Sequence, residues 1–535
     1  MEIEQLLIVS AKMILSLVLG GYLVLLFAHV IKILYLHPRK LRSKLQSQGI
    51  KGPSPSSFLY GNLLDINKIQ LQNQKQPSQE TNNQELEENS YPLQHTWPST
   101  VFPHIKQWQI QYGSVFMYSA GTIQILCVTD VEMMKEISQS TSLNLGKPSY
   151  LSRDHGPLLG QGIFSSNGPY WAHQRKTIAP EFYLNKVKEM VKLMVESTSK
   201  MIESWDEKTR NSEGKLDVKV DDYLKSLTAD IISRACFGSS YAEGERIFLK
   251  LQTLQMVLSK VPIGVPGLRH IPSKHNREIW RLDKEIKAMM LKIVRARRNP
   301  TYEKDLLQLL LDAAKGYEES DGDGLPADVS AETFVVDNCK SIYFAGHENT
   351  AHTASWCLLL LAAYPEWQAR ARTEALDVCG SELPNDSMLR QMKVLTMIIH
   401  ETLRLYPPVA FVVREALQDV SFKRIEIPKG TNIEIPIPIL HQQPEIWGPD
   451  AHQFNPERFN KGIAKACKVP SAYIPFGIGS RTCAGQNFAM IEVKVIVSMM
   501  LSRFAFSLSP GYQHSPVFRF VLEPEHGINL YLLRV

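Results

Sequence analysis

The stretch FGIGSRTCAG, residues 476–485, places a single cysteine among three glycines and an arginine, with no second cysteine close by. A thiolate is a strong, soft metal ligand, and a lone one suits a metal that takes its other ligands from elsewhere, as haem iron does. The glycines would let the backbone pass close to a flat macrocycle, while backbone N–H groups directed at the sulfur would tune its electron donation. Arg481 supplies a cation for a carboxylate. Cys483 is therefore the candidate metal ligand.

The spacing F-x-x-G-x-R-x-C-x-G within this stretch is restrictive, and it resembles the signature of the cytochrome P-450 superfamily of haem-thiolate monooxygenases. The resemblance implies a mainly α-helical fold with a small β-sheet subdomain and an N-terminal transmembrane helix. It also implies haem b, an iron protoporphyrin, with Cys483 as its axial thiolate ligand. The implied contacts of this loop with the haem come from Phe476, Gly479, Arg481 and Gly485.

A second pattern joins HETLRLYPP (400–408) to FNPERF (454–459). Glu401 and Arg404 stand three residues apart on one helix face, where they can pair, although such a pair taken alone is usually solvated. Arg458 follows at the expected distance and resembles the third member of the family's Glu-Arg-Arg cluster. The resemblance implies a buried structural cluster that locks the core beneath the haem.

A third pattern concerns the haem carboxylates. In WAHQR (171–175), Trp171 and Arg175 lie one helical turn apart, so an indole N–H and a guanidinium can point at the same anion. The segment resembles the propionate-binding helix of the family, and Arg414 resembles another propionate contact. Together with Arg481, three arginines would balance two carboxylates.

Residues 342–362 form a long apolar run with AGHENT at its middle, and burying an acid, an amide and an alcohol there is unfavourable without a function. The run resembles the family's helix above the haem, which implies that Glu348 relays protons to the distal oxygen. Asn349 departs from the family, because most relatives have threonine at this position. Thr350 keeps a hydroxyl about 100° further round the helix. Asn349 can still donate and accept hydrogen bonds, so we expect these three residues to form the catalytic group of a monooxygenase.

The bulk composition fits a folded protein, with 44% hydrophobic and 21% charged residues among 535. The net charge of +5 gives no indication of a nucleic-acid partner. The seven cysteines are odd in number and include no CxxC pair, which argues against a disulfide framework and a structural zinc site. A reducing compartment fits best.

The first residues depart from a soluble enzyme. From residue 6 to 28 the chain is almost wholly apolar, with Lys12 as the only charge, and this length is enough to cross a hydrocarbon core. A cleaved signal peptide is the rival interpretation, although the run is long for one and no clear cleavage site follows. Basic residues follow the run and Glu2 and Glu4 precede it, which predicts a cytosolic catalytic domain. The family resemblance implies a single-pass protein of the endoplasmic reticulum membrane.

We expect four regions along the chain. Residues 1–36 form the membrane anchor, 37–64 a basic and Pro-rich hinge whose residues 49–62 are extended, 65–98 a polar flexible insert, and 99–535 the haem-binding monooxygenase domain. Apolar periodicity predicts helices over 183–205 and 277–298, and strand patterns mark 114–130, 410–416 and 431–440.

Segments such as ADIISRACFGSS and FVVDNCKSIYFAGHE extend the resemblance to the plant clan-72 enzymes, closest to family 714. Members of that family oxidise gibberellins and other kaurane diterpenoid acids, and some act on pentacyclic triterpenoids. The resemblance therefore implies hydroxylation or epoxidation of a bulky apolar terpenoid that often carries one carboxylate. Such a substrate suits a deep hydrophobic pocket with one or two polar anchors.

No G-x-G-x-x-G or P-loop pattern occurs in the chain, so nicotinamide and flavin sites are expected on another protein. The resemblance implies that electrons come from NADPH through NADPH-cytochrome P-450 reductase, and that dioxygen is the co-substrate. Two alternatives stay open. One is a haem-thiolate isomerase or dehydratase that uses no external electrons, which the altered AGHENT segment favours; the other is a non-enzymatic haem protein.

Overall fold

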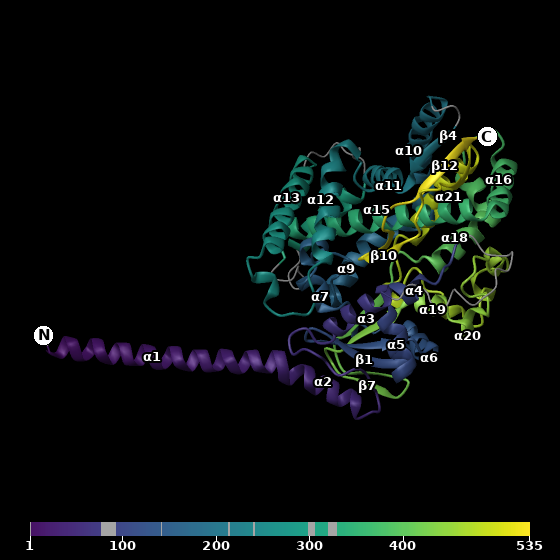
Figure 1. Cartoon of the computed structure of the whole chain (residues 1–535). Coiled ribbons are helices and arrows are strands. Elements are labelled where there is room, and N and C mark those ends of the chain that lie inside the picture. Colours follow the sequence, from purple (N-terminus) through teal and green to yellow (C-terminus); the bar gives the residue numbers. More distant parts are fainter. Residues whose placement is uncertain are drawn as a thin grey trace.

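The structure, a computed structural model, describes all residues except 1, 76–92, 141, 212–214, 239–240, 298–304 and 319–328. Most of the described elements are helices, and they gather around one long helix, α15 (Ala331–Ala363), which runs through the middle of the molecule (Figure 1). Nearly every residue of α15 is buried, which explains why its sequence lacks a single apolar stripe. The predicted fold class, mainly helical with small sheets, is confirmed.

The helices predicted from periodicity pack around this central helix. The predicted helix at 183–205 corresponds to α10 (Leu184–Asn211), and the one at 277–298 corresponds to α13 (Lys274–Ala296). α10 packs on α21 (Gln486–Leu501), which also contacts α15. Besides α1, α2, α3 and α19, which are described below, the remaining α-helices are α4 (Trp97–Val101), α5 (Pro103–Tyr112), α6 (Val131–Gln139), α7 (Ser149–Arg153), α8 (Gly156–Leu159), α9 (Gly168–Ile178), α11 (Val220–Phe237), α12 (Tyr241–Ser259), α14 (Leu306–Glu318), α16 (Pro365–Cys379), α17 (Asp386–Gln391), α18 (Lys393–Leu405) and α20 (Pro444–Trp447).

The largest sheet has five strands in the order β1-β2-β8-β5-β3. β1 and β2 form an antiparallel hairpin, β8 runs parallel to β2, and β5 is antiparallel to both β8 and β3. The predicted strands at 114–130 and 410–416 are confirmed. The five strands are β1 (Val115–Ala120), β2 (Ile123–Val128), β3 (Leu145–Gly146), β5 (Phe411–Ala416) and β8 (Asn432–Pro436).

The strand predicted over 431–440 is only half correct. β8 ends at Pro436, and the short helix α19 (Ile437–His441) begins at the next residue. Pro438 lacks an N–H for a sheet ladder but is tolerated in the first turn of a helix, so it ends the strand and starts the helix.

Three smaller sheets complete the described β-structure. Two of them are antiparallel hairpins, and the third joins β4, β12 and β9. Their strands are β4 (Lys215–Lys219), β6 (Val420–Phe422), β7 (Ile425–Ile427), β9 (Phe504–Leu508), β10 (Pro516–Arg519), β11 (Val521–Pro524) and β12 (Asn529–Arg534).

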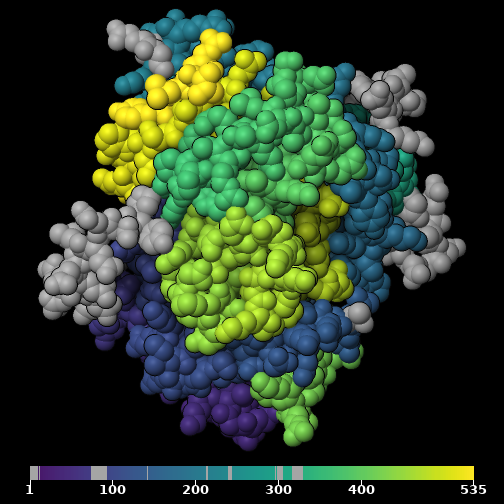
Figure 2. Space-filling view, turned by 90° about the vertical axis from the view of Figure 1, so that its right-hand side faces the viewer, coloured from purple at the N-terminus to yellow at the C-terminus, as the bar shows by residue number. Residues whose placement is uncertain are grey.

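On the face seen in Figure 2, segments that are far apart in the sequence lie side by side. α6 contacts the 3-10 turn η7 (Pro470–Ala472) and also η8 (Gly479–Arg481). The glycine-rich loop of the sequence signature therefore rests against α6.

The N-terminal apolar run forms the helix α1 (Glu2–Ile31), which projects away from the body in Figure 1. By length and composition, the stretch Lys12–Gln46 could cross a membrane, and its apolar window is not buried against the rest of the protein. Apolar side chains along α1, such as Leu15 and Leu25, are exposed. This helix is consistent with the predicted single-pass anchor.

The basic start of the region 37–64 forms a helix, whereas residues 49–62, the segment expected to be extended, contain no helix. Residues His37–Gln46 form the helix α2, whose Leu41 and Leu45 are buried against the sheet. Arg42 donates to the Pro53 carbonyl at 2.6 Å, and the Lys51 carbonyl accepts the Met117 N–H of β1. Packing of the two leucines explains the difference, because their spacing of four places both on one helix face.

The polar segment 65–98 also contains more structure than its composition suggested. Its start belongs to the helix α3 (Leu63–Lys75), where Leu63, Ile66 and Ile69 recur every three residues and pack against the core. Its end carries the buried Trp97, whose indole N–H donates to the Leu405 carbonyl. The middle of the segment lies outside the described residues.

Candidate haem-thiolate site

The loop that carries Cys483 is held in one conformation. Gly477 and Gly479 have φ values of +79° and +65°, which lie in the left-handed region that favours glycine. A Cβ on Gly479 would approach the Ser138 carbonyl of α6 to 2.9 Å. The Cys483 N–H donates to the Phe476 carbonyl at 2.8 Å. These constraints fix Cys483 just before the start of α21.

The Cys483 thiol is accessible to solvent, yet burial by the surrounding protein raises its pKa. The Gly485 N–H, which donates to the sulfur, and the charge of Arg175 offset part of this rise. All seven cysteines are free thiols; five are buried, Cys467 is half-buried, and the buried ones are Cys127, Cys236, Cys339, Cys357 and Cys379.

Two of the predicted propionate contacts lie beside this loop. Arg414 of β5 is only 6% exposed, and it donates to the Ile478 carbonyl at 3.0 Å. Arg481 donates to the Asn167 side chain at 2.8 Å, and its guanidinium carbon lies 3.8 Å from the ring centroid of Trp171 in α9. The structure thus brings Trp171, Arg414 and Arg481 to one place.

A fourth cation, Lys147, joins these groups. Burial, together with the charges of Arg414 and Arg175, lowers the pKa of Arg481 to about 9. Burial and the charges of Arg414 and Arg481 likewise lower the pKa of Lys147 well below its usual range. Among the described residues, none of the four cations forms an ion pair with a carboxylate. Sequence reasoning missed Lys147, because it lies in none of the recognised motifs.

This cation group tests whether the residues fit a haem. Four positive side chains that repel one another in a desolvated site are unfavourable unless an anion joins them. A haem carries two propionate carboxylates, and a single accessible thiol stands at the end of the adjoining loop. The donor set therefore fits the group that the sequence signature implies.

The Glu-Arg-Arg residues form one buried cluster. Arg404 makes a bidentate pair with Glu401, with both N···O distances 2.7 Å, and both side chains are fully buried. The same guanidinium donates to the carbonyls of His441, Ala451 and Gln453. Arg458 Nε lies 3.5 Å from Glu401 Oε1, and Arg458 also pairs with Asp450. The cluster ties α18 to the segment before the haem-signature loop.

The AGHENT group lies in the middle of α15. Glu348 is buried, and His352 Nε2 lies 3.1 Å from its Oε2. Burial would raise the pKa of Glu348, but His347 and the hydrogen bond with His352 hold it well below its usual range. Asn349 Nδ2 donates to the Ala345 carbonyl at 3.1 Å, whereas its buried Oδ1 has no partner among the described residues. Position 348 therefore holds an ionised carboxylate beside an unused amide acceptor.

Thr350 is buried and points toward a residue that sequence reasoning missed, Glu492 of α21. Burial raises the pKa of Glu492 well above its usual range, which favours the neutral form of its carboxyl group. The Thr350 hydroxyl opposes this rise, although neither Glu492 oxygen has a hydrogen bond of normal geometry in the described structure. The sequence contained one signal that could have identified Glu492, namely that it is an acidic residue within the apolar run 486–501.

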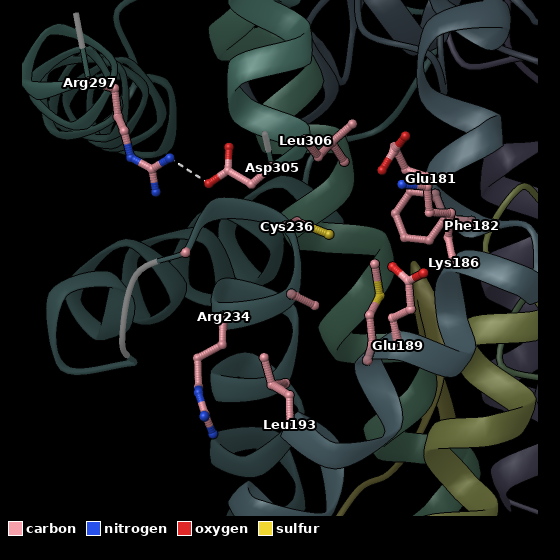
Figure 3. A pocket seen from close by; sticks show the side chains of 13 residues that line it. Glu181, Phe182, Lys186, Glu189, Leu193, Arg234, Cys236, Arg297, Asp305 and Leu306 are labelled. Atoms are coloured by element: carbon pink, nitrogen blue, oxygen red, sulfur yellow. Dashed lines mark hydrogen bonds and ion pairs between the residues drawn. The ribbon is translucent and has the colours of Figure 1, made fainter. Parts of the chain in front are cut away.

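A separate cavity of 420 Å³ lies between α10, α11 and the start of α14 (Figure 3). Its lining mixes acidic and basic side chains, and two of its arginines are already paired. Arg297 pairs with Asp305, and Arg234 pairs with Glu196 outside the cavity. The cavity therefore offers no unpaired charge from these two arginines.

Comparison with known proteins decides the family. The family model for cytochrome P450 matches residues 93–531. The chain belongs to the cytochrome P450 family. A cytochrome P450 carries haem with a cysteine thiolate ligand, and the chain is a cytochrome P450 monooxygenase that uses dioxygen and a redox partner.

Curated relatives place this P450 near family 714, as the sequence resemblance predicted. It is 48% identical to cytochrome P450 714C2 of Oryza sativa subsp. japonica, over 95% of each chain. It is 44% identical to cytochrome P450 714A2 of Arabidopsis thaliana, over 91% of this chain and 92% of that one. It is 43% identical to cytochrome P450 714B3 of Zea mays, over 95% of this chain and 94% of that one.

Solved structures support the P450 fold. Cyanobacterial CYP120A1 with bound retinoic acid superposes with a TM-score of 0.69 at 24% identity, covering 80% of this chain and 94% of that one. The haem domain of cytochrome P450DA superposes with a TM-score of 0.68 at 22% identity, covering 81% and 93%. The predicted P450 fold is confirmed.

Proposed function

We propose that this P450 hydroxylates or epoxidises a bulky apolar terpenoid, namely a gibberellin or kaurane-type diterpenoid acid or a pentacyclic triterpenoid acid. The observation that supports the haem-dependent part is a group of four cations beside an accessible thiol, none of them paired with a carboxylate of the described residues. The substrate class rests on the sequence resemblance and on the identity of 41–48% to members of family 714.

In this proposal Cys483 is the axial haem ligand, and Gly479 and Gly485 shape the loop around it while Phe476 anchors the Cys483 backbone. The haem, when bound, supplies the dioxygen-activating chemistry, which electron donation from a thiolate promotes. The Gly485 N–H bond to the sulfur moderates that donation. The propionates are held by Trp171, Arg175, Arg414 and Arg481, with Lys147 as an additional cation.

Glu348 is the proposed proton carrier. To relay a proton, the Glu348 carboxylate must accept it from one hydrogen-bond partner and pass it to another. His352, which forms a hydrogen bond with Glu348, is one of these two partners. Asn349 Oδ1 is a buried acceptor without a partner, which suits an ordered water between Glu348 and the oxygen site. Thr350 is directed toward Glu492, so in this proposal it does not carry the proton itself.

Replacement of Glu348 by glutamine should lower NADPH-driven product formation by roughly a hundredfold, within the usual contribution of a positioned proton-transfer group. The amide keeps the size of the side chain but cannot carry the proton. Product should be measured with saturating reductase, and the ferrous carbon monoxide spectrum should stay unchanged as a control for haem binding. Wild-type turnover in the variant would exclude Glu348 from proton delivery.

Replacement of Asn349 by threonine should lower the ratio of hydrogen peroxide released to product formed several-fold. Threonine restores the hydroxyl found in most relatives at this position, and a hydroxyl can donate toward the oxygen site while Asn349 now donates to its own helix. Peroxide and product should be quantified in the same reaction. An unchanged ratio would show that position 349 does not govern proton delivery.

The deciding experiment for the whole function is expression in microsomes with NADPH-cytochrome P450 reductase. In the proposal, the protein is a single-pass protein of the endoplasmic reticulum with its catalytic domain in the cytosol. A screen of diterpenoid and triterpenoid acids should give a product that requires NADPH. A product formed equally well without NADPH would favour the isomerase or dehydratase alternative, which the departure at Asn349 supports.

A further inference from the structure

The connector between α12 and α13 holds an arginine in a fixed position. Arg269 lies in the single turn η4 (Leu268–His270). Asn276 of α13 donates to the carbonyls of Leu268 and Ile271, at 2.7 Å each, on either side of this arginine. Gly264, earlier in the connector, accepts the Thr122 N–H from the β1–β2 turn at 2.9 Å. The backbone that presents Arg269 is therefore anchored at both ends.

The guanidinium of Arg269 lacks a hydrogen-bond partner among the described residues. The side chain is half-buried overall, but all three of its nitrogens are buried, and none of them forms a hydrogen bond with a described group. Asp154 is the acidic side chain that acts on it, but this carboxylate already accepts from Arg153 Nε at 2.9 Å and from the Gly264 N–H at 2.8 Å. A buried cation with unused donors is among the least favourable arrangements in a protein, unless a ligand supplies the missing anion.

A second unpartnered polar group lies beside it. His155 is 8% exposed, and its buried Nδ1 forms no hydrogen bond with any group in the described part of the chain. Its ring lies 4.7 Å from that of Phe520, at the β10–β11 turn, in an edge-on arrangement. Burial and the charge of Arg269 lower the pKa of His155 to about 4, so the charge at this site belongs to Arg269. Cation, neutral donor and aromatic ring together form a site for an anion on an apolar body.

A hydrogen bond connects this site to α15, the helix that carries Glu348 and Asn349. The segment that starts with His155 continues into Pro157, whose carbonyl accepts a hydrogen bond from the buried Lys340 of α15 at 2.9 Å. Lys340 lies five residues before Ala345, or about 7.5 Å along the helix axis. Ala345 is exposed although Phe344 and His347 beside it are buried, so it faces an open space. α8, which contains Pro157, also contacts α12 and α13 on the side seen at the left of Figure 1.

We propose that Arg269, assisted by His155, binds the carboxylate of the terpenoid substrate and so determines a preference for acids over neutral skeletons. The inference rests on the proposed function, and it names the anchor that a carboxylated substrate would use. An anionic lipid headgroup has related chemistry, but the aromatic neighbour and the link to α15 favour the substrate.

The test compares a kaurane-type diterpenoid acid and a pentacyclic triterpenoid acid with their methyl esters, which lack the charge. Binding is followed by the haem absorbance change of the full-length holoenzyme in neutral phospholipid nanodiscs. The wild type should bind at least one acid more tightly than its ester. Arg269→Gln should weaken binding of that acid roughly tenfold to a hundredfold and leave the ester almost unchanged. Arg269→Lys should keep part of the preference.

Two controls separate binding from folding. Arg281→Gln makes the same change on α13 at a side chain that is 58% exposed and paired with Glu278, and it should leave acid binding unchanged. The midpoint of thermal unfolding of Arg269→Gln should not fall below that of the wild type, because an unpaired buried charge is removed. A lower midpoint with equal weakening of acid and ester would show a structural role and overturn the proposal.

Other outcomes also decide the matter. If no acid binds better than its ester, the proposal is wrong. If Arg269→Gln instead weakens only binding to vesicles that contain anionic phospholipid, the occupant is a lipid headgroup and the proposal is wrong. Failure of the proposed function looks different, because then neither acids nor esters give an NADPH-dependent product, whatever residue stands at position 269.

Discussion

Replacement of Cys483 by serine should abolish NADPH-driven product formation and remove the long-wavelength Soret band of the ferrous carbon monoxide complex. The thiolate is the group that donates electron density to the iron, and a serine hydroxyl cannot replace it. No other cysteine can substitute, because five are buried elsewhere and Cys467 is half-buried and donates its S–H to the Val469 carbonyl. The measurement is the difference spectrum of the purified variant, together with its haem content.

Cys467→Ser is the matched control for this prediction. It removes a thiol in the segment that leads to the signature loop, and it should keep both the band and the activity. Retention of the long-wavelength band in Cys483→Ser would show that the ligand is another residue. It would also remove the reason for the glycine-rich loop.

Replacement of Glu401 by alanine should lower the free energy of unfolding by about 3–5 kcal/mol, the range for removing one partner of a buried ion pair. Arg404 would remain fully buried without its bidentate partner, and Arg458 would lose its contact with the same carboxylate. In the proposed enzyme this cluster holds the core beneath the haem, so haem retention should fall as well. Denaturant unfolding of the full-length protein, followed by circular dichroism, gives the change.

The pair formed by Arg370 and Glu457 provides the control. Its N···O distance of 2.7 Å matches that of the buried pair, but both side chains are more than 40% exposed. Arg370→Ala should therefore cost about 0–1 kcal/mol. If the two substitutions had equal effects, burial of the cluster would not contribute to the stability of the fold.

The sequence allowed the fold to be predicted where a pattern was local or strongly spaced. Apolar periodicity located α10 and α13, a long apolar run located α15, and β-branched runs located the β1–β2 hairpin. Prediction failed where a few apolar residues outweighed a polar composition, as in α3, where Leu63, Ile66 and Ile69 find the core. It failed again at α19, because two prolines separated by one residue permit either an edge strand or a helix start.

The residues of the candidate site also differ in how far the sequence could predict them. Residues within fixed spacings could be named from the sequence, because the spacing itself reflects contacts with one rigid group. Lys147 and Arg269 could not, since each stands alone in its segment and becomes unusual only when the fold leaves its cationic group without a hydrogen-bonded anion among the described residues. Glu492 gave one signal, an acid within an apolar run, but only the fold shows that it lies against Thr350 of α15. A missing partner is a property of three-dimensional packing, and a sequence does not display it.

Product formation from isotopically labelled dioxygen tests the central claim most directly. Microsomes that contain the full-length protein and the reductase should convert a terpenoid acid, with NADPH, into a product that carries one labelled oxygen atom. Unlabelled product, or product that forms without NADPH, would contradict the account of this chain as a terpenoid monooxygenase.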